Sequence, residues 1–503
     1  MHDMSDYTCQ VNSHGQRQLE LNINYPLSSD KEHKHYQLDF FVFNPFQFGI
    51  TSENYGVPRF LQDMRLYTRY TIPLISLQKL IDHSCEFSPL KRISQALAAT
   101  DPTHGLNENR ILYELRVLTD IYRRQLTDTL VLLENVISKN GSASGILARL
   151  QTFLNDINRF LASFRALHPR FIAPDVSDVL RKSFCLADEA ISLSTENTQY
   201  KLLDFVQLRH ELATAAKFLE DRLASEQSYR IKAGYPTILD PDNPVQNELF
   251  IYREGVLKKW AEGCLYMSTE PARVGARIAQ MLMSIAAGLA MAFAVIATFF
   301  TARWFSEYTI PWAILIVVAY IAKDRIKEIL RNIFISHIPQ LVADKVEDLR
   351  DPTSNNKVGS SRARVRFCHV RDLPDSVRRL RNIAGEPFRN IISPEDVIHL
   401  HKDIWINSTR IMQLHKRQDS ITEIIRIKLD SWLANMDDPV NEASCVINGN
   451  RRKFLINRVY HINLILCLSD KKMPIEGAAL FRYRVVLTRN GIMRIEHVES
   501  FSA

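Results

Sequence analysis

The feature that most constrains this chain is an uncharged apolar run of 25 residues, Ile278–Ala302, bounded by Arg277 and Arg303. A helix rises about 1.5 Å per residue, so the run would reach about 37 Å, whereas the hydrocarbon core of a bilayer is about 30 Å thick. Uncharged runs of this length are rare in soluble folds. The run therefore predicts a transmembrane helix over 278–302, and a buried helix of a soluble protein is the alternative.

A second apolar run, Tyr308–Ala322, has 15 residues and would extend about 22 Å, which is short for a span. Trp304 and Trp312 lie around its start, and aromatic residues of this kind gather at membrane–water interfaces. We expect a shorter transmembrane helix over 308–322 that continues as a helix to about residue 338. A re-entrant or interfacial helix is the alternative.

The two runs are joined by only five residues, Arg303–Glu307, so two spans would form an antiparallel hairpin with both flanks on one side of the membrane. Lysine and arginine concentrate on these flanks, which predicts that both termini are cytoplasmic. The chain is thus expected to be an integral protein of an inner or plasma membrane. The residues expected to contact the membrane surface are Lys258, Lys259, Trp260, Arg273, Arg277, Lys323, Arg325 and Lys327.

Two stripes of small residues recur every four positions in the first run: Ser284, Gly288 and Ala292, and beside them Ala286, Ala290 and Ala294. Small residues allow close helix–helix approach in lipid. The stripes predict either a seat for the second span of the same chain, which we favour, or a contact between copies of the chain in a homo-oligomer.

Composition narrows the class of protein further. The chain is 46% hydrophobic and 24% charged, with 63 Lys+Arg against 56 Asp+Glu, which is typical of a folded protein and mild in net charge. Neither apolar run contains an ionisable residue, which argues against a transporter or proton relay. The seven cysteines are scattered without a CxxC pair, which indicates reduced thiols in a cytosol-like compartment.

The flanks of the predicted hairpin differ in character. Residues 1–100 mix strand and helix signals, and the strand-like segments Leu19–Tyr25 and Tyr36–Phe43 predict an N-terminal β-hairpin. Leucine and isoleucine then recur every three or four residues, which predicts an antiparallel helical bundle over 101–232. A juxtamembrane helix is expected over 246–272.

Residues 360–503 predict an α+β unit with an antiparallel sheet, which the N-terminal hairpin could join. We expect a strand around Val397–Ile406, a helix over Ile421–Met436 and then a strand meander. Asn490-Gly491 is a strong signal for a hairpin turn in that meander. The fold class predicted for the whole chain is an α+β membrane protein.

His399 and His401 are two residues apart, so a strand would place both imidazoles on one face, as in some zinc sites. His415 is a candidate third ligand, but solvent-facing histidines explain the same residues, and the sequence favours that interpretation. No motif for a nucleophile, phosphate loop or metalloprotease is present, so neither a catalytic residue nor a cofactor is predicted.

Arg362, Arg364 and Arg366 would line one face of a strand near the predicted hairpin. Anionic lipid headgroups or a phosphate would bind such a row, although it could equally be a solvated face. Nucleic acid is disfavoured because aromatic residues for base stacking do not alternate with the arginines.

These observations predict a membrane-anchored cytoplasmic adaptor, sensor or scaffold. Its expected partners are the lipid bilayer, an unidentified cytoplasmic protein and, in an oligomer, further copies of the chain. The alternative is a membrane-bound enzyme, hydrolase-like and metal-dependent, with its site in the C-terminal unit.

Overall fold

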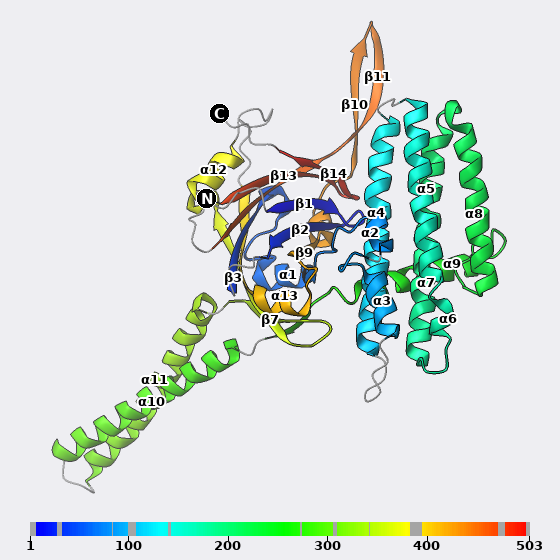
Figure 1. Cartoon of the computed structure of the whole chain (residues 1–503). Coiled ribbons are helices and arrows are strands. Elements are labelled where there is room, and N and C mark those ends of the chain that lie inside the picture. The colour runs from blue at the N-terminus through cyan, green and yellow to red at the C-terminus, as the bar shows by residue number, and fades with distance from the viewer. Residues whose placement is uncertain are drawn as a thin grey trace.

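A computed structural model describes residues 7–27, 33–82, 84–98, 107–138, 142–271, 274–304, 309–341, 343–382, 395–470 and 478–498. Two antiparallel sheets form one part of the molecule, a set of long helices lies beside them, and a pair of apolar helices projects away (Figure 1). The predicted mixture of helices and antiparallel sheet is therefore confirmed.

The larger sheet has eight strands in the order β14-β13-β12-β3-β8-β7-β6-β5, and each pairing between them is antiparallel. These strands are β3 (His33–Pro45), β5 (Ser268–Pro271), β6 (Lys345–Arg350), β7 (Lys357–His369), β8 (Glu395–Asn407), β12 (Tyr460–Asp470), β13 (Ala479–Thr488) and β14 (Gly491–His497). The strand expected around Val397–Ile406 and the hairpin turn at Asn490-Gly491 are both present, and Gly491 has a positive φ of 142°.

The smaller sheet has the order β1-β2-β9-β4. Its strands are β1 (Thr8–Ser13), β2 (Gln18–Pro26), β4 (Met64–Tyr70) and β9 (Ser420–Lys428). The prediction that Leu19–Tyr25 and Tyr36–Phe43 pair with each other is wrong, because β2 pairs with β1 and β9 while β3 lies between β8 and β12. β3 is buried continuously from Leu38 to Asn44, as is typical of a central strand covered on both faces.

The helix expected over Ile421–Met436 is also absent. The segment forms strand β9, followed by the short helix α14 (Asp430–Leu433). β9 is buried on both faces from Ile421 to Ile425, so its apolar residues lose the period of two and mimic helical spacing. Its richness in the β-branched residue isoleucine was the contrary signal.

The long helices beside the sheets agree with the predicted bundle (Figure 1). They are α4 (Glu108–Ser138), α5 (Ala143–Arg165), α7 (Asp178–Gln207) and α8 (Ala213–Ala233). The helix expected over 246–272 is α9 (Pro244–Glu262), which ends earlier than predicted because Ser268–Pro271 form strand β5. The shorter helices are α1 (Gly56–Asp63), α2 (Leu77–Ile81), α3 (Pro89–Ala98), α6 (His168–Phe171), α12 (Asp375–Arg381) and α13 (Ser408–Leu414). Apolar faces of α4 and α5 are buried in the main core, and Ser177 caps the start of α7.

The projecting helices are α10 (Val274–Trp304) and α11 (Ile310–Leu341), which lie side by side (Figure 1). β5 directly precedes α10 and β6 follows α11, and these two strands pair with each other. The helical pair is therefore inserted at the edge of the larger sheet, which holds its two ends together.

A two-stranded ribbon of β10 (Val440–Ile447) and β11 (Asn450–Asn457) extends away from the sheets and from the projecting helices (Figure 1). Nearly all of its residues are exposed.

Candidate functional site

The surface of α10 is apolar and exposed. Its segment Gln280–Trp304 is long and apolar enough to cross a membrane, and only 11% of the most apolar stretch is buried. Within the described part of the chain, no second helix meets this description, so the second span over 308–322 remains a prediction. A core helix of a soluble protein would be mostly buried, which α10 is not.

The two stripes of small residues on α10 have different environments. Ala286 and Ala290 are buried in the contact with α11, whereas Ser284, Gly288 and Ala292 are exposed. The stripe that contains Ala286 and Ala290 therefore seats the neighbouring helix of the same chain, as expected for close approach through small side chains. The homo-oligomer contact remains a prediction.

Six of the eight residues predicted to contact the membrane surface have described side chains, three on α9 and three on α11. On α9, Lys258 and Lys259 are exposed, but Trp260 packs against the core with the Arg116 guanidinium 5.5 Å from its ring centre. On α11, Lys323 lies over the Tyr320 ring, and Arg325 and Lys327 are exposed. Arg273 and the side chain of Arg277 lie outside the described residues. Contact with a bilayer stays a prediction for all of them.

The three arginines of β7 alternate as predicted with buried residues, Ala363 and Val365. The neighbouring strand β8 places Asp403 opposite Arg362, His401 opposite Arg364 and His399 opposite Arg366. Directly opposed residues of an antiparallel pair point to the same face, so the arginine row and the two histidines share one face of the larger sheet.

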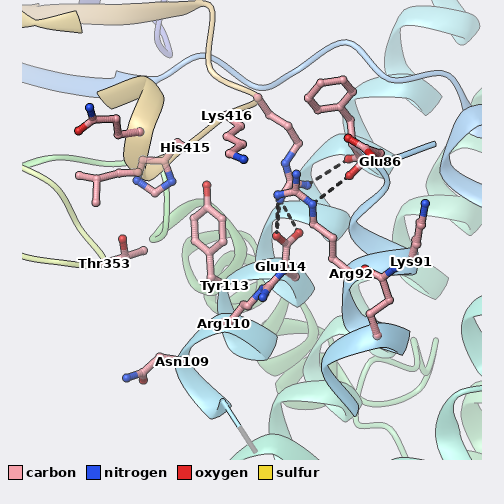
Figure 2. A pocket seen from close by; sticks show the side chains of 15 residues that line it. Glu86, Lys91, Arg92, Asn109, Arg110, Tyr113, Glu114, Thr353, His415 and Lys416 are labelled. Carbon is pink, nitrogen blue, oxygen red and sulfur yellow. Dashed lines mark hydrogen bonds and ion pairs between the residues drawn. The ribbon is translucent and has the colours of Figure 1, made fainter. Parts of the chain in front are cut away.

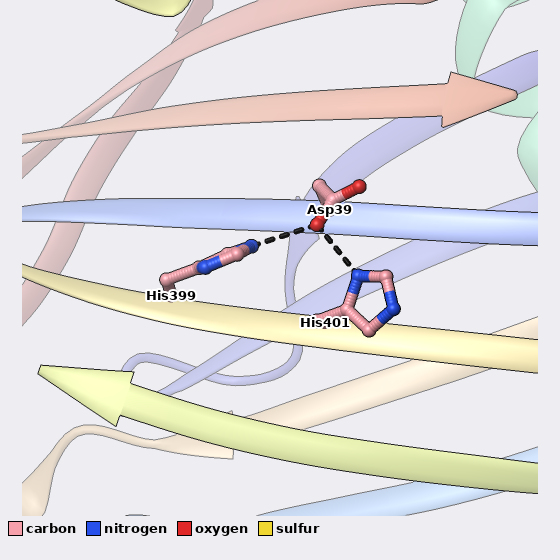
Figure 3. A group of neighbouring side chains, drawn as sticks. All are labelled: Asp39, His399 and His401. Carbon is pink, nitrogen blue, oxygen red and sulfur yellow. Dashed lines mark hydrogen bonds and ion pairs between the residues drawn. The ribbon is translucent and has the colours of Figure 1, made fainter. Parts of the chain in front are cut away.

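His399 and His401 meet on Asp39 of β3, on the other side of β8 (Figure 3). His399 Nε2 lies 2.7 Å and His401 Nδ1 lies 2.8 Å from Oδ1 of this buried carboxylate. One ligand atom from each of the three residues lies within 4.8 Å of the others. The Phe41 ring stacks on His399 with the ring centres 4.3 Å apart, which fixes that imidazole.

A second carboxylate extends this cluster along β8. Asp403 Oδ2 lies 3.3 Å from His401 Nε2, so His401 has a carboxylate at each ring nitrogen. Asp403 Oδ1 also lies 2.7 Å from His35 Nε2, and His35 stacks on Trp405. These partners hold the His401 ring in one orientation.

Charge within the cluster follows from this geometry. Hydrogen bonds to Asp39 and Asp403 raise the pKa of His401 to about 9, so this imidazole is protonated at neutral pH when only protons are bound. Burial alone would raise the pKa of the Asp39 carboxyl, but hydrogen bonds with His399 and His401 outweigh burial and hold that pKa well below its usual range.

His415 does not join this cluster. It ends helix α13, and its Nε2 lies 2.5 Å from Oδ1 of Asp351 in a separate buried network with the Tyr70 hydroxyl. Hydrogen bonding to His415 and Thr353 overcomes burial and holds the pKa of the Asp351 carboxyl well below its usual range. The third residue whose ligand atom lies beside those of His399 and His401 is Asp39, which was not among the residues predicted from the sequence.

His415 also lines an open polar hollow of about 660 Å³ between the bundle and the loop after α13 (Figure 2). In its wall Arg417 and Arg92 both point to Glu114, and Arg417 binds both of its carboxylate oxygens at 2.5 Å. Both guanidinium groups are held by the one carboxylate of Glu114, so this part of the wall is a structural ion-pair network, and no contact in it indicates a particular ligand.

The signal for Asp39 was its position in the sequence. It is the only acid of the strand segment Tyr36–Phe43, which is apolar from Leu38 onward apart from this residue, and a buried carboxylate needs charged or hydrogen-bonding partners. Which partners it finds depends on the pairing of β3 with β8, some 360 residues away in the chain.

Comparison of the chain with protein-family models, curated proteins and solved structures finds no match.

Proposed function

We propose that this chain is a membrane-anchored cytoplasmic adaptor or scaffold, held at a bilayer by the α10–α11 hairpin. The observation that carries the proposal is the exposed apolar surface of α10. Large side chains such as Leu289 and Phe299 point outward, while alanines occupy the contact with α11. A contiguous apolar surface of this size is unfavourable in water and favourable in lipid.

The proposal includes α11 as a second, shorter crossing. Ile314, Val317 and Val318 in its first half are exposed, as on α10. The pairing of β5 with β6 supports this arrangement, because it holds the start of α10 and the end of α11 at one sheet edge. Both flanks would then lie on one side, and their basic residues favour the cytoplasmic side.

The β10–β11 ribbon supports the adaptor part of the proposal. Val446 and Leu455 are 71% and 79% exposed on a ribbon that pairs with no other described strand. An isolated two-stranded ribbon has little stability of its own in water. A protein partner that covers these side chains would stabilise it.

Epitope tags at the two ends of the full-length protein test the topology. With intact cells, an external protease should cleave neither tag, and it should cleave both once the membrane is permeabilised. Cleavage of one tag in intact cells would contradict the two-crossing hairpin, and recovery of the protein in the soluble fraction would contradict anchoring altogether.

A membrane-bound enzyme is the second candidate function. It is favoured by one observation, the convergence of Asp39, His399 and His401 on the same sheet face as the arginine row. A screen of the purified protein for hydrolysis of phosphate esters, with and without added Zn²⁺, tests it. Turnover that His401→Gln abolishes would favour the enzyme, and equal turnover in that variant would exclude this site.

A further inference from the structure

The cluster on β3 and β8 has the composition of a metal site rather than of an ordinary surface ion pair. Asp39 Oδ1, His399 Nε2 and His401 Nδ1 supply one carboxylate and two imidazoles, the donor types that zinc binds in proteins. Both imidazoles converge on a single carboxylate oxygen.

The spacing of the donor atoms suits a tetrahedral ion. Metal–ligand bonds of about 2.0–2.1 Å separate neighbouring ligand atoms by about 3.3 Å in that geometry. The two imidazole nitrogens now lie 2.7 and 2.8 Å from the Asp39 oxygen. Side-chain movements of about half an ångström would therefore admit an ion without any change in the strands.

The surroundings of His401 provide an independent argument. A histidine that binds a metal through one ring nitrogen commonly donates its other N–H to a carboxylate, which fixes the tautomer and orients the ring. Asp403 lies 3.3 Å from His401 Nε2 and is itself held by His35. The structure thus contains both the ligand and the outer carboxylate that would orient it.

The arginine row indicates what the ion would face. Arg364 lies opposite His401, and its buried Nε has no hydrogen-bond partner among the described residues. Arg366 lies opposite His399 and is exposed. Two guanidinium groups beside a divalent cation form a strongly positive surface that an anionic ligand would neutralise.

We propose that Asp39, His399 and His401 bind Zn²⁺, with Asp403 as a positioning residue, and that the fourth coordination position takes an anionic ligand such as a phosphate group held by Arg364. This site does not depend on the anchoring proposal, because it lies on the sheet and uses no residue of α10 or α11.

The test is a titration of the full-length protein, stripped of metal by chelation, with Co²⁺ as a spectroscopic substitute for Zn²⁺. A single Co²⁺ per chain should bind with the visible absorption of a tetrahedral site and should be displaced by Zn²⁺. His399→Gln and His401→Gln should each weaken binding by at least 10-fold, and Asp403→Asn by about 10- to 100-fold. His369→Gln, on an exposed histidine of the neighbouring strand β7, is the matched control and should bind as the wild type does.

Circular dichroism and thermal unfolding of each variant establish that the fold is intact. The wild-type titration alone can refute the metal site. If Co²⁺ does not bind in a saturable way, the three residues form only an imidazolium–carboxylate network. Stoichiometric binding retained in the double variant His399→Gln/His401→Gln would place the metal elsewhere and would also overturn the proposal.

Inorganic phosphate tests the anionic ligand. Added to the Co²⁺-loaded wild type, phosphate should shift the visible spectrum in a saturable way. Arg364→Gln should weaken the affinity for phosphate, measured from this shift, about 10-fold. A spectrum unchanged by phosphate would remove the anionic ligand from the proposal.

Discussion

Replacing two outward-facing residues of α10 by arginine tests whether this helix lies in lipid or in water. Leu289 and Phe293 are 52% and 40% exposed and lie near the middle of Gln280–Trp304. At the centre of a membrane helix, each arginine costs about 2.5–3.5 kcal/mol, and each lost Leu or Phe forfeits about 0.3–0.6 kcal/mol. The double variant Leu289→Arg/Phe293→Arg should therefore disfavour insertion by about 6–8 kcal/mol.

The same substitutions should be nearly neutral in water. Because both side chains are exposed, arginine would extend into solvent and should change the free energy of unfolding by no more than about 0.5 kcal/mol. A penalty of about 6 kcal/mol corresponds to more than a thousandfold change in the insertion equilibrium. The effect expected if α10 lies in lipid is therefore far larger than the effect expected if it lies in water.

The assay is resistance of the full-length protein to extraction from membranes at alkaline pH. Wild type should stay with the membranes, and the double variant should be released. Val131→Arg/Leu132→Arg on α4 is the matched control, because those side chains are 48% and 66% exposed on a helix of the bundle. Retention of the α10 variant to the same extent as the control would show that α10 does not lie in lipid.

Two further predictions concern the stability of the fold. Burial raises the pKa of Asp120 to about 7, with Arg123 opposing and Glu262 adding to the rise. Between pH 4 and 7 the folded state keeps a proton on Asp120 that the unfolded state loses, so the free energy of unfolding should fall by at most about 4 kcal/mol over this range. Urea titrations at several pH values should show this fall. In the variant Asp120→Asn, the free energy of unfolding should depend less on pH. Gly359→Ala would place a Cβ 2.5 Å from a backbone oxygen of β8 and should lower the free energy of unfolding by about 1–3 kcal/mol, measured by thermal unfolding. Gly255→Ala is the control, because the space around its Cβ is open, and it should not destabilise the protein.

Local patterns sufficed for the elements whose apolar residues keep one period. The bundle helices follow the spacing of three to four residues, and the β13–β14 hairpin follows its Asn490-Gly491 turn. The alternation of Arg362, Arg364 and Arg366 with buried residues also followed from a period of two. In each case the signal lies within one stretch of chain.

The remaining errors concern long-range pairing. β3 and β9 are each buried on both faces, so neither shows the alternation that reveals a half-exposed strand. Their partners lie hundreds of residues away, and no local signal encodes them. His399 and His401 could be identified from the sequence because they are two residues apart in one strand. Asp39, their common partner, could not, because it lies on a strand that is distant in the sequence.

The larger sheet connects the two proposals. The α10–α11 hairpin is inserted between β5 and β6, and β7 and β8 follow β6 across the sheet. Neighbouring strands lie about 4.8 Å apart, so β8 with His399 and His401 is about 10 Å from β6. A hairpin that spans the membrane would hold the proposed Zn²⁺ site close to the membrane surface, where anionic lipid headgroups are one source of the phosphate ligand.

The most direct test of whether α10 lies in a bilayer is the environment of a spin label at Leu289→Cys in the full-length protein, reconstituted in lipid vesicles and with its other accessible cysteines replaced. Oxygen partitions into lipid, whereas a nickel chelate stays in water. If α10 lies in lipid, oxygen should relax this label more strongly than the chelate does, and a label at Leu132→Cys on α4 should behave in the opposite way. Equal, water-like relaxation at both positions would contradict it.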